Sequence, residues 1–348
     1  MAQTMKAAVV RAFRAPLEIE EVLVPSPGPG EVLVRIKVTG VCHTDLHAAD
    51  GDWPVKPTPP FIPGHEGVGI VAGVGAGVKH LKEGDAVGIA WLHDACGECE
   101  YCITGWETLC PSQRNSGYSV NGSFAEYAIG SASYVGRLPK NPDFAGLAPM
   151  LCAGVTTYKG IKETEARPGE WIAISGVGGL GHIAIQYARA MGLHVAALDV
   201  TTEKLDLARM AGADVAIHAE QTDAATQVIK ATQGGAHGVL VTAVSPTAFS
   251  QAIDMARRRG TVVLVGLPPG TFPTPIFDVV LKRITIRGSI VGTRADLAEA
   301  LAFAADGLVK SHVHVASLED VNRVFNELRG GKVDGRIVLD LTRTPALT

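Results

Sequence analysis

The sequence has little net charge and no long hydrophobic run. Its 348 residues include 31 basic and 35 acidic side chains, a net charge of −4, without long blocks of like charge. This argues against binding to nucleic acid or to an anionic membrane surface. No stretch approaches the ~18 unbroken apolar residues of a membrane helix, and the start, MAQTMKAAVVRAF, lacks the pattern of a secretory signal. We expect a cytoplasmic protein with no nucleic-acid or membrane partner.

Aromatic residues are also scarce, at 5% of the chain, and there is no low-complexity segment or internal repeat. Hydrophobic residues nevertheless make up 47%, so the cores should be mainly aliphatic. A chain of this length favours two domains, each able to bury its own core. The 40 glycines then indicate tight turns and close backbone approaches rather than disorder.

Cysteine is sparse as well, yet four of the six cysteines lie in one segment, HDACGECEYCITGWETLC. In a reducing cytosol such thiols are more often metal ligands or redox groups than disulfides. Unrelated core cysteines, an iron–sulfur cluster and a tetrahedral zinc site are the alternatives. The long last gap of C-x2-C-x2-C-x7-C argues against a cluster, and the polar segment is too poor in apolar residues to fold without a metal. We predict a structural zinc in a lobe of about residues 93–113, bound by Cys96, Cys99, Cys102 and Cys110.

The two remaining cysteines, Cys42 and Cys152, stand alone in the sequence. Between them His65 and Glu66 lie in a glycine-rich segment, PGHEGVGIVAGVGAGV. Two cysteines and a histidine are a known ligand set for a catalytic zinc with one open position. A lone buried cysteine, however, is usually a small hydrophobic residue, and spacing does not show whether these side chains meet. From the residues alone both interpretations stay open.

The second half of the chain has the pattern of a dinucleotide-binding unit. A predicted strand, Trp171–Ser175, leads into a G-x-G-x-x-G loop and then a helix-period run. The loop residues are Gly176, Gly178, Gly179, Leu180 and Gly181. Such glycines let helix N–H groups approach a pyrophosphate. A second strand from His194 ends at Asp199, whose carboxylate would bind ribose hydroxyls and repel a 2′-phosphate, which favours NAD over NADP.

Strand-like and helix-like runs continue to alternate after Asp199, which predicts an α/β domain with a doubly wound parallel sheet. The predicted strands lie near Asp214–Ile217, Gly238–Thr242, Thr261–Val265 and Ile284–Ile286, and the predicted helices include 222–232 and 247–257. We place this domain at residues 153–289. Residues 1–152 should form a separate, largely β domain, and the segment 290–348 contains a strand, within RGGKVDGRIVLDL, that returns to it.

These motifs together make the chain resemble the zinc-dependent medium-chain alcohol dehydrogenases, over nearly its whole length. The matching elements are Cys42-His43-Thr44-Asp45, Gly64-His65-Glu66 with Gly69, Gly75 and Val78, the four-cysteine segment and the nucleotide loop. The shorter yeast- and bacterial-type enzymes are the most similar. The resemblance implies a GroES-like, mainly-β catalytic domain and a Rossmann coenzyme domain. It also implies two zincs per chain, with the catalytic one bound by Cys42, His65 and Cys152.

The resemblance further implies a reaction, hydride transfer between an alcohol and NAD with zinc as a Lewis acid. Thr44 would receive the alcohol proton and His47 would deliver it to solvent; the alternative for His47 is an ordinary surface histidine. Asp45 would hold the second nitrogen of His65. Glu66 would lie beside the zinc, as a transient ligand or as an outer-shell charge.

Several positions match cofactor contacts of the family. His43 and Arg336 correspond to positions that neutralise the pyrophosphate. Because residue 43 is histidine rather than arginine, cofactor affinity should be weaker and pH-dependent. Lys204 would contact the adenosine ribose, and Val265 is a further predicted cofactor contact. Thr157 would contact the nicotinamide, or it is an ordinary helix threonine.

Trp53 and Trp91 match positions that line the substrate pocket of the small-alcohol enzymes. Two indoles beside the zinc would favour short primary alcohols such as ethanol and propanol; the alternative is that either one packs in the domain core. A polyol or secondary-alcohol dehydrogenase is the second candidate. Candidates from other classes are an iron–sulfur electron-transfer protein and a non-catalytic nucleotide-binding protein. The shorter relatives are mostly homotetramers, so we expect a homo-oligomer.

Overall fold

The computed structural model describes residues 2–221 and 223–342. It divides into two compact units, which are described separately below. Unit 1 comprises Met1–Cys152, Thr293–Leu301 and Ser311–Thr348, and unit 2 comprises Ala153–Gly292 and Ala302–Lys310. The domain limits expected from the sequence, 1–152 with 290–348 and 153–289, remain a prediction of which parts of the chain fold separately. Met1, Thr222 and residues 343–348, which fall within those limits, lie outside the described residues.

Unit 1 is built on a seven-stranded, mostly antiparallel sheet in the order β16-β17-β3-β4-β5-β9, with β8 also paired to β3. The strands are β3 (Glu31–Val41), β4 (Gly67–Val74), β5 (Ala86–Ile89), β8 (Tyr127–Ser131), β9 (Gly136–Arg137), β16 (Val313–Ala316) and β17 (Arg336–Asp340). Alternate residues of β3, such as Val32, Val34 and Ile36, enter the core, as the two-residue period of a strand requires. The predicted returning strand is β17, which pairs antiparallel with β3, and this prediction is confirmed.

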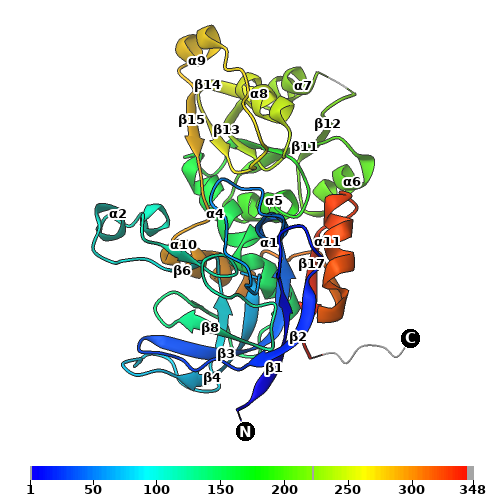
Figure 1. Ribbon diagram of the computed structural model, residues 1–348. Helices are drawn as coiled ribbons and strands as arrows, with labels where there is room; N and C mark the ends of the chain where they lie inside the picture. Colours follow the sequence, from blue (N-terminus) through cyan, green and yellow to red (C-terminus); the bar gives the residue numbers. More distant parts are fainter. Residues whose placement is uncertain (1, 222, 343–348) are drawn as a thin grey trace. The chain divides into compact units, whose positions relative to one another are not determined.

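A second core of unit 1 lies under the hairpin of β1 (Thr4–Val9) and β2 (Glu18–Leu23). Helix α11 (Val321–Arg329) follows the short η3 (Leu318–Asp320) and covers this core (Figure 1). Its buried residues recur at helical spacing, as expected of an amphipathic helix; they are Val321, Val324, Phe325 and Leu328. The remaining elements of this unit are α1 (His43–Asp50), β6 (Leu92–Asp94), α2 (Glu100–Ile103), η1 (Glu107–Leu109), β7 (Arg114–Asn115), α3 (Phe144–Leu147) and η2 (Ala148–Leu151).

Unit 2 contains a six-stranded parallel sheet in the order β12-β11-β10-β13-β14-β15. The strands are β10 (Trp171–Ser175), β11 (His194–Asp199), β12 (Val215–His218), β13 (Ala236–Val241), β14 (Ala256–Leu264) and β15 (Thr285–Gly288). The helices are α4 (Ala153–Glu163), α5 (Gly181–Ala190), α6 (Thr202–Met210), α7 (Ala224–Ala231), α8 (Pro246–Met255) and α9 (Ile276–Lys282), and α10 (Arg294–Ala305) runs from unit 1 into unit 2. This is the strand order of a Rossmann fold, so the predicted doubly wound sheet is confirmed.

The predicted helix over residues 247–257 is too long at its end. Helix α8 stops at Met255, because Ala256 has an extended backbone (φ −74°, ψ 135°) and pairs with Ala236 of β13. Alanine and arginine favour helices, so the local pattern concealed a strand that depends on pairing with β13. The other predicted helix corresponds to α7, and its first residue, Thr222, lies outside the described residues. Within residues 2–221 and 223–342 no helix is both long and apolar enough to cross a membrane.

Candidate active site and metal centres

Cys42, His65, Glu66 and Cys152 come together inside unit 1. Cys42 lies between β3 and α1, His65 and Glu66 directly precede β4, and Cys152 follows η2. One ligand atom from each of the four lies within 4.8 Å of the others, and all four residues are buried. Their spacing in the sequence left open whether they meet, and the fold brings them together.

The electrostatics of this cluster favour a cysteine thiolate. A hydrogen bond with Cys152 holds the pKa of the Cys42 thiol well below its usual value, against the opposing effect of burial. His65 and the Arg336 guanidinium act in the same direction as that hydrogen bond. Since the thiolate is the form in which cysteine binds metals, Cys42 is suited to be a ligand.

His65 is oriented by a buried carboxylate. Its Nδ1 lies 2.9 Å from Oδ1 of Asp45, and both side chains are 1% exposed. Asp45 also accepts hydrogen bonds from the backbone N–H groups of Gly64 (3.0 Å) and Cys42 (2.9 Å), which fix its position. The other ring nitrogen of His65, Nε2, is buried with no hydrogen-bond partner among the described residues. This orphaned nitrogen beside two cysteines fits a metal with nitrogen and sulfur ligands.

Glu66 pairs with Arg336 of β17 rather than with solvent. Oε1 of Glu66 contacts Nη2 of Arg336, and the two residues are 0% and 4% exposed. Burial raises the pKa of Glu66 to about 7, although Arg336 acts to lower it. Oε2 of Glu66 occupies space that Gly40 leaves open, since a Cβ on Gly40 would lie 1.8 Å from it. Arg336 is therefore held by Glu66, and its predicted contact with the cofactor remains a proposal.

Helix α1 carries the residues predicted to move the proton. Oγ1 of Thr44 is 3.7 Å from Sγ of Cys42. His47, one turn further on, is 32% exposed and its Nδ1 lies 3.0 and 3.1 Å from the two carboxylate oxygens of Asp52. Sequence reasoning missed Asp52; its signal was a carboxylate directly after the glycine that ends the helix.

The two predicted pocket tryptophans are joined through a third ring. Trp91 packs edge-on against His65 with ring centroids 5.3 Å apart, and Trp53 stacks on His47 at 5.2 Å. Tyr118 lies between the indoles, 5.4 Å from Trp91 and 6.0 Å from Trp53. Both tryptophans also pack partly against the core under the hairpin, so the two interpretations of these residues are compatible. Nothing in the sequence around Tyr118 indicated its part in this chain of rings.

The four clustered cysteines form a second, separate group. Their sulfur atoms lie within 4.8 Å of one another, with Cys110 buried and Cys96 exposed. The short helix α2, inside this segment, buries none of its residues. Backbone N–H groups of Glu98 and Cys99 lower the pKa of the Cys96 thiol to about 7. A lobe with so little core of its own fits a metal at its centre.

The loop between β10 and α5 has a backbone that requires glycine at two points. Gly176 has a φ of +99°, and a Cβ on Gly181 would lie 1.9 Å from the carbonyl oxygen of Gly176. A Cβ on Gly178 would meet nothing within 4 Å, so this part of the loop faces open space. The geometry suits the close approach of a phosphate to backbone N–H groups at the start of α5.

Asp199, the last residue of β11, is hydrogen-bonded to the backbone of this loop. One carboxylate oxygen accepts a hydrogen bond from the N–H of Val177 (2.6 Å), and the other accepts from Val200 (2.7 Å). Lys204 in α6 places its Nζ 3.9 Å from the same carboxylate. The acidic residue and the glycine loop are therefore linked directly, as the dinucleotide-binding pattern requires.

The other predicted cofactor residues are placed as follows. His43 is exposed at the first position of α1. Thr157 is fully buried in α4, where its hydroxyl donates to the carbonyl oxygen of Ala153 (2.8 Å), as in an ordinary helix threonine. Val265 directly follows β14 and is buried. Their roles toward a cofactor remain predictions.

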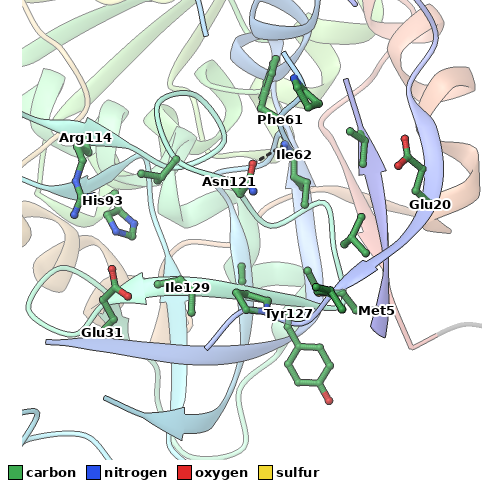
Figure 2. Close-up of a pocket in the computed structure, with 18 of the residues that line it drawn as sticks. Met5, Glu20, Glu31, Phe61, Ile62, His93, Arg114, Asn121, Tyr127 and Ile129 are labelled. Carbon is green, nitrogen blue, oxygen red and sulfur yellow. Dashed lines mark hydrogen bonds between the residues drawn. The ribbon is translucent and has the colours of Figure 1, made fainter. Parts of the chain in front are cut away.

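Unit 1 also contains a cavity of about 400 Å³ that is not lined by either cysteine group (Figure 2). The hairpin, the segment around Phe61 and Ile62, and the strand β8 line it, together with His93 and Arg114. None of the residues of either cysteine group contributes to its wall. This cavity therefore lies outside the candidate active site.

Two family models and the related sequences of known proteins match this chain consistently. Residues 28–140 match the family model "Alcohol dehydrogenase GroES-like domain", and residues 179–306 match "Zinc-binding dehydrogenase". An alcohol dehydrogenase of Rhizobium meliloti is 62% identical over 97% of this chain and 99% of its own. The chain belongs to the zinc-dependent medium-chain alcohol dehydrogenase family. Its recognition from sequence motifs is thereby confirmed.

Solved structures of relatives agree with this membership. The alcohol dehydrogenase of the archaeon Aeropyrum pernix has a TM-score of 0.88 at 36% identity, covering 96% of this chain and 99% of that one. An acetophenone reductase of Geotrichum candidum, solved in complex with NAD, has a TM-score of 0.85 at 29% identity, covering 98% of each chain. The alcohol dehydrogenase described here is thus an enzyme of the oxidoreductase class, with the GroES-like and Rossmann units expected of the family.

Proposed function

We propose that this alcohol dehydrogenase interconverts small primary alcohols and aldehydes with NAD and binds two zincs per chain. The catalytic zinc would be held by Cys42, His65 and Cys152, and the structural zinc by the four cysteines of the lobe. The observation that carries the proposal is Nε2 of His65, a buried nitrogen that lacks a partner among the described residues and lies beside two cysteines. Asp45 on Nδ1 completes the carboxylate–histidine arrangement typical of zinc sites.

When bound, the zinc supplies a Lewis acid for the substrate oxygen, and NAD supplies the hydride acceptor. The chain's own residues then have to move one proton and exclude water. Thr44, next to Cys42, offers a hydroxyl that can receive the alcohol proton. His47 is partly exposed and can release a proton to solvent, while Asp52 orients its ring through Nδ1.

The choice of NAD rests on Asp199. Its carboxylate is held at the carboxyl end of β11 beside the glycine loop, where it would accept hydrogen bonds from ribose hydroxyls. A 2′-phosphate at the same place would meet a negative charge. The NAD complex of the related Geotrichum reductase supports this proposal. We also propose contacts to NAD from His43, Thr157, Lys204, Val265 and Arg336.

Replacing Asp199 by alanine should lower kcat/KM with NAD by about 10- to 100-fold, because hydrogen bonds to a charged group are worth ~1.5–3 kcal/mol. The ratio of activity with NADP to activity with NAD should rise. Asp199→Asn is the matched control for the loop, since one amide oxygen can still accept from Val177. Steady-state kinetics with both coenzymes check this, and an unchanged coenzyme ratio in both variants would remove Asp199 from the proposal.

Short primary alcohols are proposed as substrates because of Trp53 and Trp91, whose rings lie beside His47 and His65. Secondary alcohols and polyols remain the second candidate. Initial rates of NAD reduction, from methanol to hexanol and with isopropanol, benzyl alcohol and sorbitol, separate the two. We expect kcat/KM to peak between ethanol and butanol. A peak on sorbitol or isopropanol would reject the pocket assignment, and no activity at all with zinc bound would reject the catalytic proposal.

A homotetramer in the cytoplasm is part of the same proposal. It is supported by the family resemblance of this chain to the shorter yeast- and bacterial-type enzymes. The molar mass of the purified enzyme in solution tests the oligomeric state, and a monomer would contradict it.

A further inference from the structure

The metal lobe has no positive charge of its own. Residues 94–113 include four acidic side chains, Asp94, Glu98, Glu100 and Glu107, but no lysine or arginine. Four thiolates on one divalent zinc would add further negative charge to the same segment. Cations that offset this charge must therefore come from outside the segment.

Glu107 is the acidic residue of the lobe that is most in need of a partner. It belongs to η1, three residues before Cys110, and its side chain is only 6% exposed. A carboxylate buried without a counterion is costly, by several kcal/mol in real proteins. Whatever pairs with Glu107 also fixes the segment that carries the last cysteine of the lobe.

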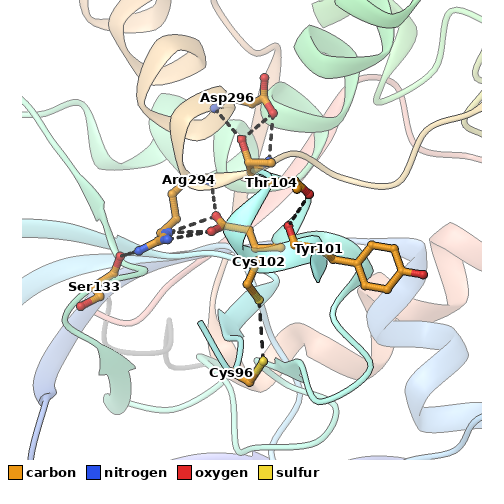
Figure 3. A network of polar contacts seen from close by, with 9 residues as sticks. Cys96, Tyr101, Cys102, Thr104, Ser133, Arg294 and Asp296 are labelled. Carbon is orange, nitrogen blue, oxygen red and sulfur yellow. Dashed lines mark hydrogen bonds and ion pairs between the residues drawn. The ribbon is translucent and has the colours of Figure 1, made fainter. Parts of the chain in front are cut away.

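That partner is Arg294, 187 positions further along the chain (Figure 3). Its Nε lies 3.0 Å from each carboxylate oxygen of Glu107, and its Nη2 donates to Oε2 at 2.7 Å. The backbone N–H of Arg294 donates to Oε1 at 2.8 Å. Glu107 thus binds both the guanidinium fork and the main chain at the first residue of α10.

Arg294 is itself held in place on two sides. Its guanidinium carbon lies 4.3 Å from the centre of the Tyr134 ring, a cation–π distance. Just before it, Thr293 donates from its N–H (3.0 Å) and its hydroxyl (2.7 Å) to the buried carboxylate of Asp296, which fixes the start of α10. The guanidinium, on a side chain that is 48% exposed, is therefore fixed in position by its contacts rather than by burial.

The hydrogen bonds and charge of Glu107 are the main reason that the pKa of Arg294 is raised; Tyr134 and Cys102 contribute in the same direction. Arg114, the other arginine next to the lobe, pairs with Asp94 at its base. The two arginine side chains are similarly exposed, at 48% for Arg294 and 51% for Arg114, but the carboxylate of Glu107 is 6% exposed and that of Asp94 is 23% exposed.

We propose that Arg294 is a positioning residue of the four-cysteine metal site, which clamps the lobe through Glu107 and offsets the charge of its thiolates. Without Arg294, the carboxylate of Glu107 would have to move into water to be hydrated. The segment that carries Cys110 would then be less firmly held. The lobe metal should then be lost more readily. This inference rests on the proposed binding of zinc by the four cysteines, but not on the alcohol that the enzyme oxidises.

The test compares Arg294→Ala with Arg114→Ala, which removes a similarly exposed arginine whose partner, Asp94, is less buried than Glu107. Both are made in full-length enzyme carrying Cys152→Ser, so that zinc is bound only by the lobe. Zinc per chain is measured first, and then the rate of zinc transfer to the chromogenic chelator 4-(2-pyridylazo)resorcinol. Direct partners of metal ligands typically contribute 10- to 100-fold to metal affinity. Because Arg294 acts through Glu107 rather than on a ligand, we expect the lower end of that range, with zinc released ~10-fold faster from Arg294→Ala. Arg114→Ala should stay within about twofold of the parent.

Arg294→Lys separates the effect of the positive charge from the effect of the bidentate guanidinium contact. Lysine keeps one positive charge but cannot make the bidentate contact or lie flat on Tyr134, so its release rate should fall between alanine and arginine. This variant carries the test if Arg294→Ala does not fold. Equal release rates in all variants, with native circular dichroism, would overturn the proposal. A parent protein that binds no zinc would instead overturn the zinc assignment of the lobe, and this inference with it.

Discussion

Replacing Cys152 by serine should abolish alcohol oxidation while leaving one zinc bound per chain. Cys152 is 9% exposed at the end of η2, and its thiol is hydrogen-bonded to Cys42 within the candidate catalytic cluster. A serine hydroxyl is a much poorer zinc ligand than a thiolate at the same place. Because a Lewis acid contributes several kcal/mol to the transition state, kcat/KM should fall by about four orders of magnitude.

The measurement is zinc per chain together with kcat/KM for ethanol. Cys102→Ser is the matched control, since it makes the same chemical change in the lobe and should remove the other zinc. This variant should have a clearly lower free energy of unfolding, while the kcat of the molecules that remain folded should change little. Circular dichroism should show a native fold for Cys152→Ser. If that variant kept two zincs and most of its activity, the assignment of Cys42, His65 and Cys152 would be wrong.

A second large effect is expected when Arg336 is replaced by methionine. Arg336 and Glu66 are 4% and 0% exposed, so the change leaves a carboxylate buried without its counterion. Removal of one partner of such a buried pair typically costs ~3–5 kcal/mol. Unit 1 should therefore unfold at a markedly lower urea concentration, and tryptophan fluorescence can follow this because three of the four tryptophans belong to this unit.

Two further variants show whether the lost charge is responsible. Adding Glu66→Gln to Arg336→Met removes the stranded carboxylate and should recover much of the stability. Arg323→Met makes the same chemical change in an ion pair whose arginine is 54% exposed, and should cost less than ~1 kcal/mol. A midpoint for Arg336→Met equal to that of Arg323→Met would contradict the argument.

The parts of the fold that depend on residues close to one another in the sequence could be predicted from it. The strand, glycine loop and acidic residue from Trp171 to Asp199 appear in the structure as β10, the loop and β11, because each signal lies close to the next. The four lobe cysteines could be grouped for the same reason. The end of α8 was predicted wrongly, since Ala256 leaves the helix to pair with another strand.

Long-range contacts were out of reach of sequence spacing. Cys42, His65 and Cys152 could be joined only through resemblance to a family, until the structure placed them within 4.8 Å. Tyr118 between two tryptophans and Arg294 against Glu107 gave no signal that could be interpreted from spacing. Each of these contacts depends on tertiary packing, and no local propensity or periodicity encodes it.

The position of β17 has a consequence for synthesis of the enzyme. Cys42, His65 and Cys152 are all present once residue 152 has been made, whereas Arg336 follows Glu66 by 270 positions. At ~5–20 residues per second, translation adds Arg336 roughly 14–54 s after Glu66. For the last 184 of these 270 positions, after Cys152 has been added, the nascent chain has every proposed zinc ligand of the catalytic site, but the carboxylate next to them has no counterion and β3 lacks its neighbour β17. The proposed zinc ligands of the catalytic site are therefore all synthesised before the arginine that neutralises Glu66 and before the strand that completes the sheet beside β3.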